Sequence, residues 1–184
     1  DDLGQVTKTE LPTGLDLSYA YDRNGNVTDI SGGGRTEGYA YDANGRIVAT
    51  TLADGNTLTS TYDADGRVTE EKNASGAATL YAYDDGGRLI KITDALGRDT
   101  LMGYDPNGNM TSKTTADGNE TLYAYDVMNR LGKLTYPDGK ESFYEYDPDG
   151  NLKVEVDKYN GLLSDGRTFR KRMFTYTPDD NLES

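Results

Sequence analysis

The chain repeats the dipeptide Tyr-Asp seven times at nearly constant spacing. The tyrosines of these pairs are Tyr21, Tyr41, Tyr62, Tyr83, Tyr104, Tyr125 and Tyr146. Successive tyrosines are 21 residues apart, except that the first step is 20 residues. A degraded eighth copy, Tyr176-Thr177, follows after a longer step. A period of about 20 residues is typical of one small supersecondary unit stacked many times. We therefore expect the function to come from a long repeated surface or wall rather than from a single pocket.

The repeat pattern also reaches the first residues of the chain. Asp1 and Gly4 stand where the paired Asp and the turn glycine of an earlier copy belong, and Gly14 precedes Tyr21 by the same distance as Gly55 precedes Tyr62. We expect residue 1 to lie inside a repeat. The chain is then a fragment of a longer array that continues at least on its N-terminal side.

The composition excludes several classes of function. The 184 residues contain neither Cys nor His, which removes disulfides, the commonest zinc and copper ligand sets, and Ser-His or Cys-His nucleophiles. A formal charge of −13 argues against nucleic acid as a partner, because phosphate binding requires a basic surface. No apolar run approaches the roughly 20 residues of a membrane span. We therefore expect no enzyme, no metal and no cofactor, and we interpret the acidity as a solubilising face.

A four-residue turn follows the tyrosine in each copy. In Asp22-Arg23-Asn24-Gly25 and its equivalents, Asp first, Asn or Asp third and Gly fourth predict a type I turn followed by a left-handed residue. Asn129 replaces this Gly in the sixth copy and is the next best residue for that conformation. The structural repeat motif consists of Tyr21, Asp22, Gly25, Tyr41, Asp42, Gly45, Tyr62, Asp63, Gly66, Tyr83, Asp84, Gly87, Tyr104, Asp105, Gly108, Tyr125, Asp126, Tyr146, Asp147 and Gly150.

A second turn lies between successive Tyr-Asp pairs, for example at Asp54-Gly55 and Asp117-Gly118. Runs of about six to eight residues with strand chemistry, such as residues 46–52 and 57–62, connect the two kinds of turn. Helix is improbable, because glycines recur too often for an amphipathic helix. Each repeat is therefore expected to be an antiparallel β-hairpin, and the fold class all-β.

The alternation of side chains predicts three columns across the sheet. Residues two apart share a face, so the paired tyrosines form one column, and the residues two before them form a second: Tyr19, Tyr39, Ser60, Tyr81, Met102, Tyr123, Tyr144 and Phe174. The third column, two residues after the turn glycine, is Val27, Ile47, Val68, Leu89, Met110, Leu131 and Leu152. Stacking of the repeats in register is expected to bury these columns cooperatively.

Two other interpretations of the motif residues compete with packing. The tyrosine columns would form a carbohydrate-stacking surface if they were exposed, which a glycan array tests. Asp-x-Asp-Gly at Asp63 and Asp147 has half the pattern of a calcium loop, but the third acidic residue and the closing Glu are absent. The paired Asp residues are therefore interpreted as turn formers and not as metal ligands.

The residues also resemble a known family. Tyr81-Ala82-Tyr83-Asp84-Asp85-Gly86-Gly87-Arg88-Leu89 and residues 123–131 resemble the YD repeat of Rhs proteins, which also occurs in Tc toxin B and C components, in wall-associated bacterial proteins and in teneurins. The resemblance covers residues 1 to about 152. Departures are Asn26, Asn109 and Asn151 where the family often has Arg, and the turn Gly32-Gly33-Gly34. An insertion at residues 158–167 stretches the register, so we expect residues 153–184 to form a lengthened hairpin and a degenerate last repeat.

The resemblance implies a curved, spiralling sheet of β-hairpins that is part of a hollow shell. In bacterial relatives such a shell encloses a toxic C-terminal polypeptide, so the expected function is a non-catalytic wall segment of a secreted or cell-surface protein. Its expected partners are the rest of its own shell and an enclosed toxin domain. The alternative is a carbohydrate- or partner-binding repeat module on the cell surface.

The ends of such an array expose sheet edges, which tend to pair with other strands. We expect edge-to-edge association of the chain, or shielding by residues 153–184, where Arg167, Arg170, Lys171 and Arg172 gather basic charge. A clean monomer in sedimentation after deletion of residues 153–184 would contradict both expectations.

Overall fold

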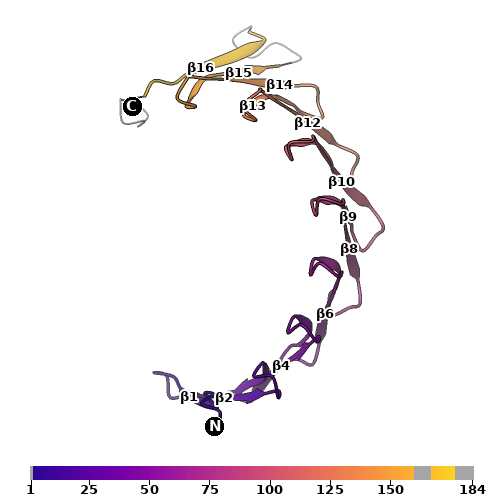
Figure 1. Ribbon diagram of the computed structural model, residues 1–184, viewed down its shortest axis with the longest axis vertical. Helices are drawn as coiled ribbons and strands as arrows, with labels where there is room; N and C mark the ends of the chain where they lie inside the picture. The colour runs from indigo at the N-terminus through magenta and orange to yellow at the C-terminus, as the bar shows by residue number, and fades with distance from the viewer. Residues whose placement is uncertain (1, 160–166, 177–184) are drawn as a thin grey trace. The chain divides into compact units, whose positions relative to one another are not determined.

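The computed structural model describes residues 2–159 and 167–176. The described residues form β-strands joined by turns, without helix, and therefore without a helix long and apolar enough to cross a membrane. The expected all-β class of antiparallel hairpins is confirmed (Figure 1). Residues 160–166 of the expected insertion at 158–167 lie outside the described residues. The proposed boundary at residue 152 stays a prediction.

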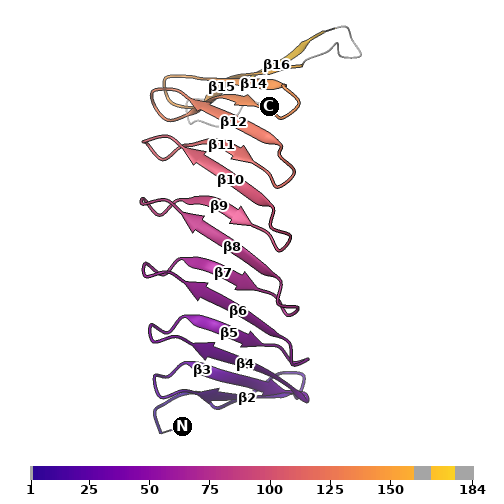
Figure 2. The same cartoon turned by 90° about the vertical axis from the view of Figure 1, so that its right-hand side faces the viewer.

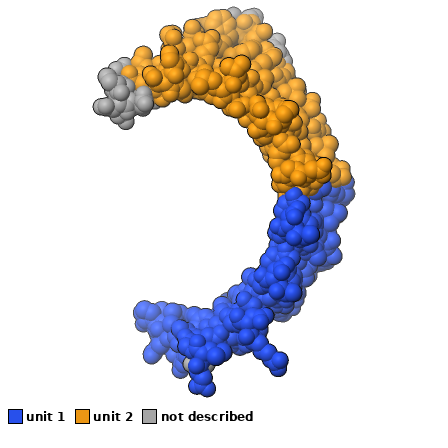
Figure 3. Space-filling view, in the orientation of Figure 1, with its two compact units in different colours: residues 1–82, 93–97 blue, residues 83–92, 98–184 orange. Residues whose placement is uncertain are grey.

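The chain divides into two compact units (Figure 3). Unit 1 comprises residues 1–82 and 93–97, and unit 2 comprises residues 83–92 and 98–184. The strands of the first half are β1 (Lys8–Glu10), β2 (Asp16–Tyr21), β3 (Val27–Gly32), β4 (Arg35–Tyr41), β5 (Ile47–Thr51), β6 (Thr57–Tyr62), β7 (Val68–Lys72) and β8 (Ala78–Tyr83). Those of the second half are β9 (Leu89–Thr93), β10 (Asp99–Tyr104), β11 (Met110–Thr114), β12 (Glu120–Tyr125), β13 (Leu131–Thr135), β14 (Glu141–Tyr146), β15 (Leu152–Lys158) and β16 (Phe169–Met173).

Within each unit, strands that follow one another in the chain are neighbours in the sheet and run antiparallel. In unit 1 this order runs from β1 to β8, and in unit 2 it holds from β10 to β16 (Figure 2). The sheet of each unit is curved (Figure 1). This meander follows directly from the sequence, because two short turns per repeat leave no chain for a crossover connection.

A β-bulge lies immediately before the paired tyrosine of the repeat. The register shifts between Ala20 and Tyr21, between Ala124 and Tyr125, and at the equivalent positions of β4, β6, β10 and β14. A bulge bends its strand and increases the local twist. Its regular recurrence gives these hairpins the same bend, which explains the curvature of the sheet in each unit.

The sheet is a single layer, and its side chains are mostly half-buried. Among the described residues, only Val154, at 5% exposure, and Ser142, at 2%, are buried. Both tyrosine columns are half-buried, and in the third column Ile47 remains 40% exposed. Stacking of repeats alone thus covers the columns only partly, because the described residues of each unit form no second layer on either face of the sheet.

The turns have the predicted hydrogen bonds. The Asp22 carboxylate accepts hydrogen bonds from the backbone N–H groups of Asn24 (2.8 Å) and Asn26 (2.9 Å), and the Gly25 N–H donates to the Asp22 carbonyl. Asn129, with φ of 61°, is the one residue other than glycine at positive φ in the described chain. The left-handed conformation expected for the fourth turn position is therefore confirmed where Gly is replaced.

The glycine triplet explains the one shorter step, between Tyr21 and Tyr41. Gly32 pairs with Arg35, which leaves only Gly33 and Gly34 in the loop, and both have positive φ (59° and 76°). This is the geometry of a type I′ hairpin turn, which side chains with a Cβ rarely adopt. The second turn of this repeat is shorter, and the Tyr-Asp spacing shortens with it.

Candidate functional site: the joint between repeats

The paired tyrosine of one repeat binds the backbone of the preceding repeat. The Tyr125 hydroxyl donates to the Met110 carbonyl at 2.9 Å, and equivalent bonds of 2.7–3.0 Å join Tyr21 to Val6, Tyr41 to Val27, Tyr62 to Ile47, Tyr104 to Leu89, Tyr146 to Leu131 and Tyr176 to Leu152. The acceptor belongs in each case to the apolar third column or its equivalent. Tyr176 makes this bond although Thr177 replaces the paired Asp.

The residue directly after the fourth turn position (Gly, or Asn129 in the sixth copy), here called the joint residue, connects one repeat to the next. Where it is Arg, its guanidinium binds the Asp of its own turn: Arg130 Nε lies 2.7 Å from Asp126 Oδ2. The same guanidinium donates from Nη1 to the Asp147 carbonyl of the next repeat at 3.3 Å and lies 4.7 Å from the Tyr146 ring centre. One side chain thus makes an ion pair, a hydrogen bond and a cation–π contact across the joint.

The same contacts occur at two further arginines. Arg46 binds Asp42, donates to the Asp63 carbonyl at 3.3 Å and lies 4.5 Å from the Tyr62 ring centre. Arg88 does the same with Asp84, the Asp105 carbonyl at 3.0 Å and Tyr104 at 5.0 Å. The sequence showed that Arg recurs in the motif but not what it does. Its spacing, four positions after the paired Asp, was the available signal for the ion pair.

An asparagine takes a different role at the joint. Asn109 donates to the Asp105 carboxylate of its own turn at 2.9 Å, but its short side chain reaches the next repeat only through Asn129, whose Oδ1 accepts from Nδ2 of Asn109 (2.8 Å) and of Asn107 (3.0 Å). The two departures from the motif, Asn109 in place of Arg and Asn129 in place of Gly, therefore belong to one contact.

A hydrogen bond, and not lack of space, links these two departures. A Cβ added to Gly66 would lie 3.3 Å from Nη1 of Arg46, the joint residue before it, but a Cβ added to Gly108 or Gly150, which follow Arg88 and Arg130, would meet no atom within 4 Å. The Asn109–Asn129 hydrogen bond of 2.8 Å is therefore what connects the two positions.

We expect Asn109 and Asn129 to be energetically coupled. Asn109→Arg alone removes the amide that donates to Asn129 Oδ1 and destabilises the chain, whereas Asn109→Arg with Asn129→Gly rebuilds the joint seen at Arg46 and stabilises it. The coupling energy in a double-mutant cycle, measured by urea unfolding, should be about 1 kcal/mol or more.

Asn26→Arg is the matched control for this cycle. Gly45 already occupies the next turn, and a Cβ there would lie 3.9 Å from Asn26 Oδ1, so this single substitution should stabilise without a second change. Additive effects of Asn109→Arg and Asn129→Gly would show that the two positions are independent.

The turns shift the pKa of their carboxylates. The backbone N–H of Arg46, followed by the Arg46 side chain and by Asn44, holds the pKa of Asp42 below its usual value. The pKa values of Asp63, Asp84 and Asp126 are lowered in the same way. At Asp22 and Asp105 the largest cause is instead the side-chain amide of Asn26 or Asn109. Burial raises the pKa of the Tyr125 and Tyr146 hydroxyls.

The second column makes no common hydrogen bond. Tyr81 donates to Glu71 Oε2 at 2.7 Å, and Tyr39 lies 3.1 Å from Glu37 Oε2. Across residues 2–159 and 167–176, no group of three or more acidic side chains is arranged to hold a metal ion. At the basic cluster, Arg172 binds Glu155 (3.0 Å) and Asp157 (3.2 Å) of β15.

Solved structures of other proteins contain a similar sheet of repeats. The chain superposes on the structure of TcdB2-TccC3-Cdc42 with a TM-score of 0.69 and 20% identity, over 89% of this chain and 10% of that one. It also superposes on the structure of a Photorhabdus luminescens Tc holotoxin pore that carries a mutation in TccC3. The TM-score is 0.62 and the identity 18%, over 91% of this chain and 10% of that one. It also superposes on TcdB2-TccC3 without its hypervariable C-terminal region, with a TM-score of 0.57 and 18% identity, over 99% of this chain and 12% of that one.

These likenesses concern the fold, and the chain spans about a tenth of the length of the Tc chains that it matches. The search of curated protein sequences gave no match. The RHS Repeat family matches residues 21–57, 62–99 and 104–141, which together make up more than half of the chain. The protein therefore belongs to the RHS Repeat family.

Proposed function

We propose that this chain is a non-catalytic wall segment of an RHS-repeat shell, in which a longer parent protein encloses a toxic C-terminal polypeptide for secretion and delivery. The observation that supports this most is the use of the recurrent side chains. The paired tyrosines, turn carboxylates and joint arginines described above bind their own turn or the neighbouring repeat. The residues that define the repeat thus serve assembly of the sheet.

The bulge pattern supports a wall that bends. The hairpins that begin with β2, β4, β6, β10, β12 and β14 carry the bulge at the same position, and equal bends repeated over many copies curve a long strip in one sense. The structural likeness to Tc toxin proteins supports the same role, as does the resemblance of the repeat to that of secreted toxin components.

The test is a low-resolution electron-microscopy envelope and limited proteolysis of the parent protein that contains this segment. We expect an internal void and a C-terminal polypeptide that resists protease until the wall is opened by denaturant. A compact parent without a void would contradict the proposal, and so would a C-terminal segment that is cleaved at once.

The tyrosine columns do not favour the alternative of a carbohydrate-binding repeat. The paired tyrosine hydroxyls are already donated to backbone carbonyls, and both columns are half-buried between neighbouring side chains. A stacking platform would instead present the ring faces to solvent. Binding of glycans on an array by this chain, lost on substitution of Tyr81 or Tyr123, would reverse this assignment.

A further inference from the structure

The strand β16 lies at an open edge of the sheet of unit 2 (Figure 2). Within residues 2–159 and 167–176, it pairs with β15 and with no other strand. All five of its residues are exposed, including Phe169 at 48% and Met173 at 68%. The repeat pattern also weakens here, since the RHS Repeat matches end at residue 141 and Thr177 replaces the paired Asp. The outer edge of β16 therefore has no described neighbour and is open to another strand.

Alternate residues of β16 present their backbone groups at this outer edge. The Phe174 N–H donates to the Lys153 carbonyl at 3.0 Å, and the Tyr159 N–H donates to the Thr168 carbonyl at 2.7 Å. The even-numbered residues of this segment thus direct their backbone groups towards β15. Because N–H and C=O groups change direction from one residue to the next along a strand, those of the odd-numbered residues point outwards: Phe169, Lys171 and Met173. Such a row of unpaired groups pairs readily with a further strand.

One arginine of β16 is available to a partner. Arg172 is already bound, because its guanidinium lies 3.0 Å from the Glu155 carboxylate and 3.2 Å from the Asp157 carboxylate. Arg170 lies two residues earlier and thus on the same face of the sheet, but it makes no ion pair with any residue of the described ranges. In a chain with a net charge of −13, this basic strand is an exception. Its charge therefore favours an acidic partner.

The inner neighbour of β16 shows which side chains fit it. β15 alternates two valines with two carboxylates, which places the valines on one face of the sheet and the carboxylates on the other. The cross-strand pairs are Val154 with Met173, Glu155 with Arg172, Val156 with Lys171 and Asp157 with Arg170. Side chains of a strand interact with those of the strands on both sides. A second strand with the alternation of β15 therefore also fits the outer edge.

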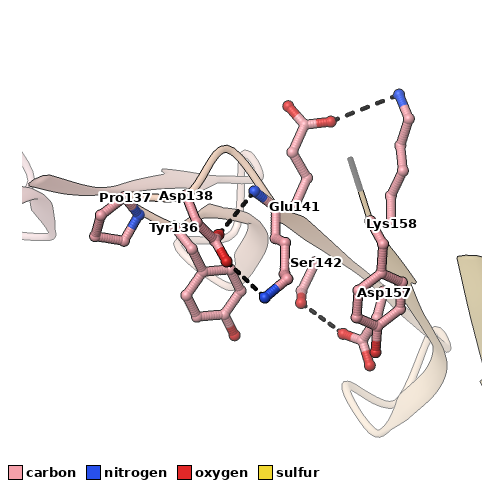
Figure 4. A pocket seen from close by; sticks show the side chains of 9 residues that line it. Tyr136, Pro137, Asp138, Glu141, Ser142, Asp157 and Lys158 are labelled. Carbon is pink, nitrogen blue, oxygen red and sulfur yellow. Dashed lines mark hydrogen bonds and ion pairs between the residues drawn. The ribbon is translucent and has the colours of Figure 1, made fainter. Parts of the chain in front are cut away.

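The carboxylate opposite Arg170 is committed to other contacts. Asp157 accepts the Ser142 hydroxyl of β14 at 2.6 Å, at the side of a cavity of about 420 Å³ (Figure 4). Its second oxygen accepts from the Arg172 guanidinium at 3.2 Å. The charge of Arg170 is therefore left for carboxylates that come from outside the described sheet.

We propose that the outer edge of β16 binds an extended acidic segment of a partner polypeptide as an added antiparallel strand. The outward backbone groups of Phe169, Lys171 and Met173 supply the hydrogen bonds. Carboxylates of the bound segment face Arg170, and apolar residues that alternate with them cover Phe169 and Met173 on the other face. The proposal rests on the edge of unit 2 and does not depend on the shell function.

The test measures binding of a fluorescent peptide, Val-Glu-Val-Glu-Val-Glu-Val, to the 184-residue chain by fluorescence anisotropy. We expect saturable binding that weakens as salt is added, because the charges are exposed. Arg170→Gln should weaken binding roughly fivefold, since it removes the cation that faces the carboxylates. Lys171→Gln should weaken it by roughly twofold or less, because Lys171 lies on the apolar face.

Arg23→Gln is the matched control in the protein, because Arg23 is exposed on a turn of unit 1 and its loss should leave binding unchanged. Two control peptides should not bind: one has lysine in place of glutamate, and the other has methyl groups on its backbone amides. The proposal is overturned if the acidic peptide does not bind, if either control peptide binds equally well, or if Arg170→Gln and Arg23→Gln bind alike.

Sedimentation of the chain without peptide tests a second copy as the occupant of this edge. Self-association that Arg170→Gln abolishes would assign the edge to a second copy and would also overturn the proposal. Circular dichroism shows whether each variant keeps its sheet, and the two control peptides decide the matter if a variant does not.

Discussion

Replacing Tyr125 by alanine should lower the free energy of unfolding by about 2–4 kcal/mol, given the usual cost of deleting a large packed ring and its half-buried setting here. The ring packs in the paired-tyrosine column, and its hydroxyl donates to Met110 of the preceding repeat at 2.9 Å. In a single-layer array each repeat is stabilised only by its neighbours. Removal of the Tyr125 ring, which lies inside the array, therefore weakens the coupling between the repeats on either side of it. Urea unfolding followed by circular dichroism measures this loss.

Two variants separate the contributions of the Tyr125 ring and hydroxyl. Tyr125→Phe removes only the hydrogen bond to the Met110 carbonyl and should cost about 1 kcal/mol. Tyr21→Ala removes the equivalent bond, to Val6 at 2.7 Å, but next to the short strand β1, where loss of contact frays one hairpin. It should cost clearly less than Tyr125→Ala. Equal losses for Tyr21→Ala and Tyr125→Ala would mean that the repeats do not stabilise one another.

Acid should unfold the chain at a pH below about 4. The turn carboxylates of Asp22, Asp42, Asp63, Asp84, Asp105 and Asp126 all have pKa values lowered from 3.8 in the folded chain. A group with a depressed folded pKa contributes stability that is fully present above its unfolded pKa and is lost as the pH falls through the folded value. Six turns then lose their ionised carboxylates within the same range of pH.

Between pH 7 and about 4.3, the change in net charge has the opposite effect on stability to the loss of turn carboxylates. The chain carries −13 at pH 7, so lowering the pH towards 4.3 relieves repulsion among its carboxylates. Below that pH the chain becomes positive and the turns lose their acceptors, so both effects then destabilise it. We expect the midpoint of urea unfolding to change little between pH 7 and 5 and to fall steeply between pH 4 and 2.

Single substitutions show whether the turn carboxylates cause this fall. Asp84→Asn keeps an oxygen that accepts from the turn N–H groups but removes the charge facing Arg88, so the fall below pH 4 should become shallower. Glu145→Gln, at an exposed strand position opposite Val154, should leave the slope as it is. Stability that rises or stays constant from pH 4 to pH 2 would contradict this account.

The local structure of the repeat follows from short-range chemistry and was predictable. The Asp-x-Asn-Gly turns, the left-handed Asn129 and the hairpin meander depend on residues that are close together in the chain. The period assigned the paired tyrosines to one column, but the donation of their hydroxyls to backbone carbonyls of the preceding repeat was seen only in the structure. The turn role of the paired Asp residues was equally visible, because Asp accepts from N–H groups two and four positions later.

Other features depend on which residues of different strands and repeats meet in space, and these only the tertiary structure decided. The bulge before each paired tyrosine, the contact of Arg130 with the next repeat and the pairing of Asn109 with Asn129 are of this kind. The sequence indicated a lengthened hairpin after residue 152, but only the structure shows that Tyr136 of the β13–β14 turn and Tyr159 after β15 line one cavity. The sequence by itself determined the hairpin and its period, since turns and alternation act over short stretches of chain. The degree of burial and the joints between hairpins were decided by the register in which neighbouring strands pair.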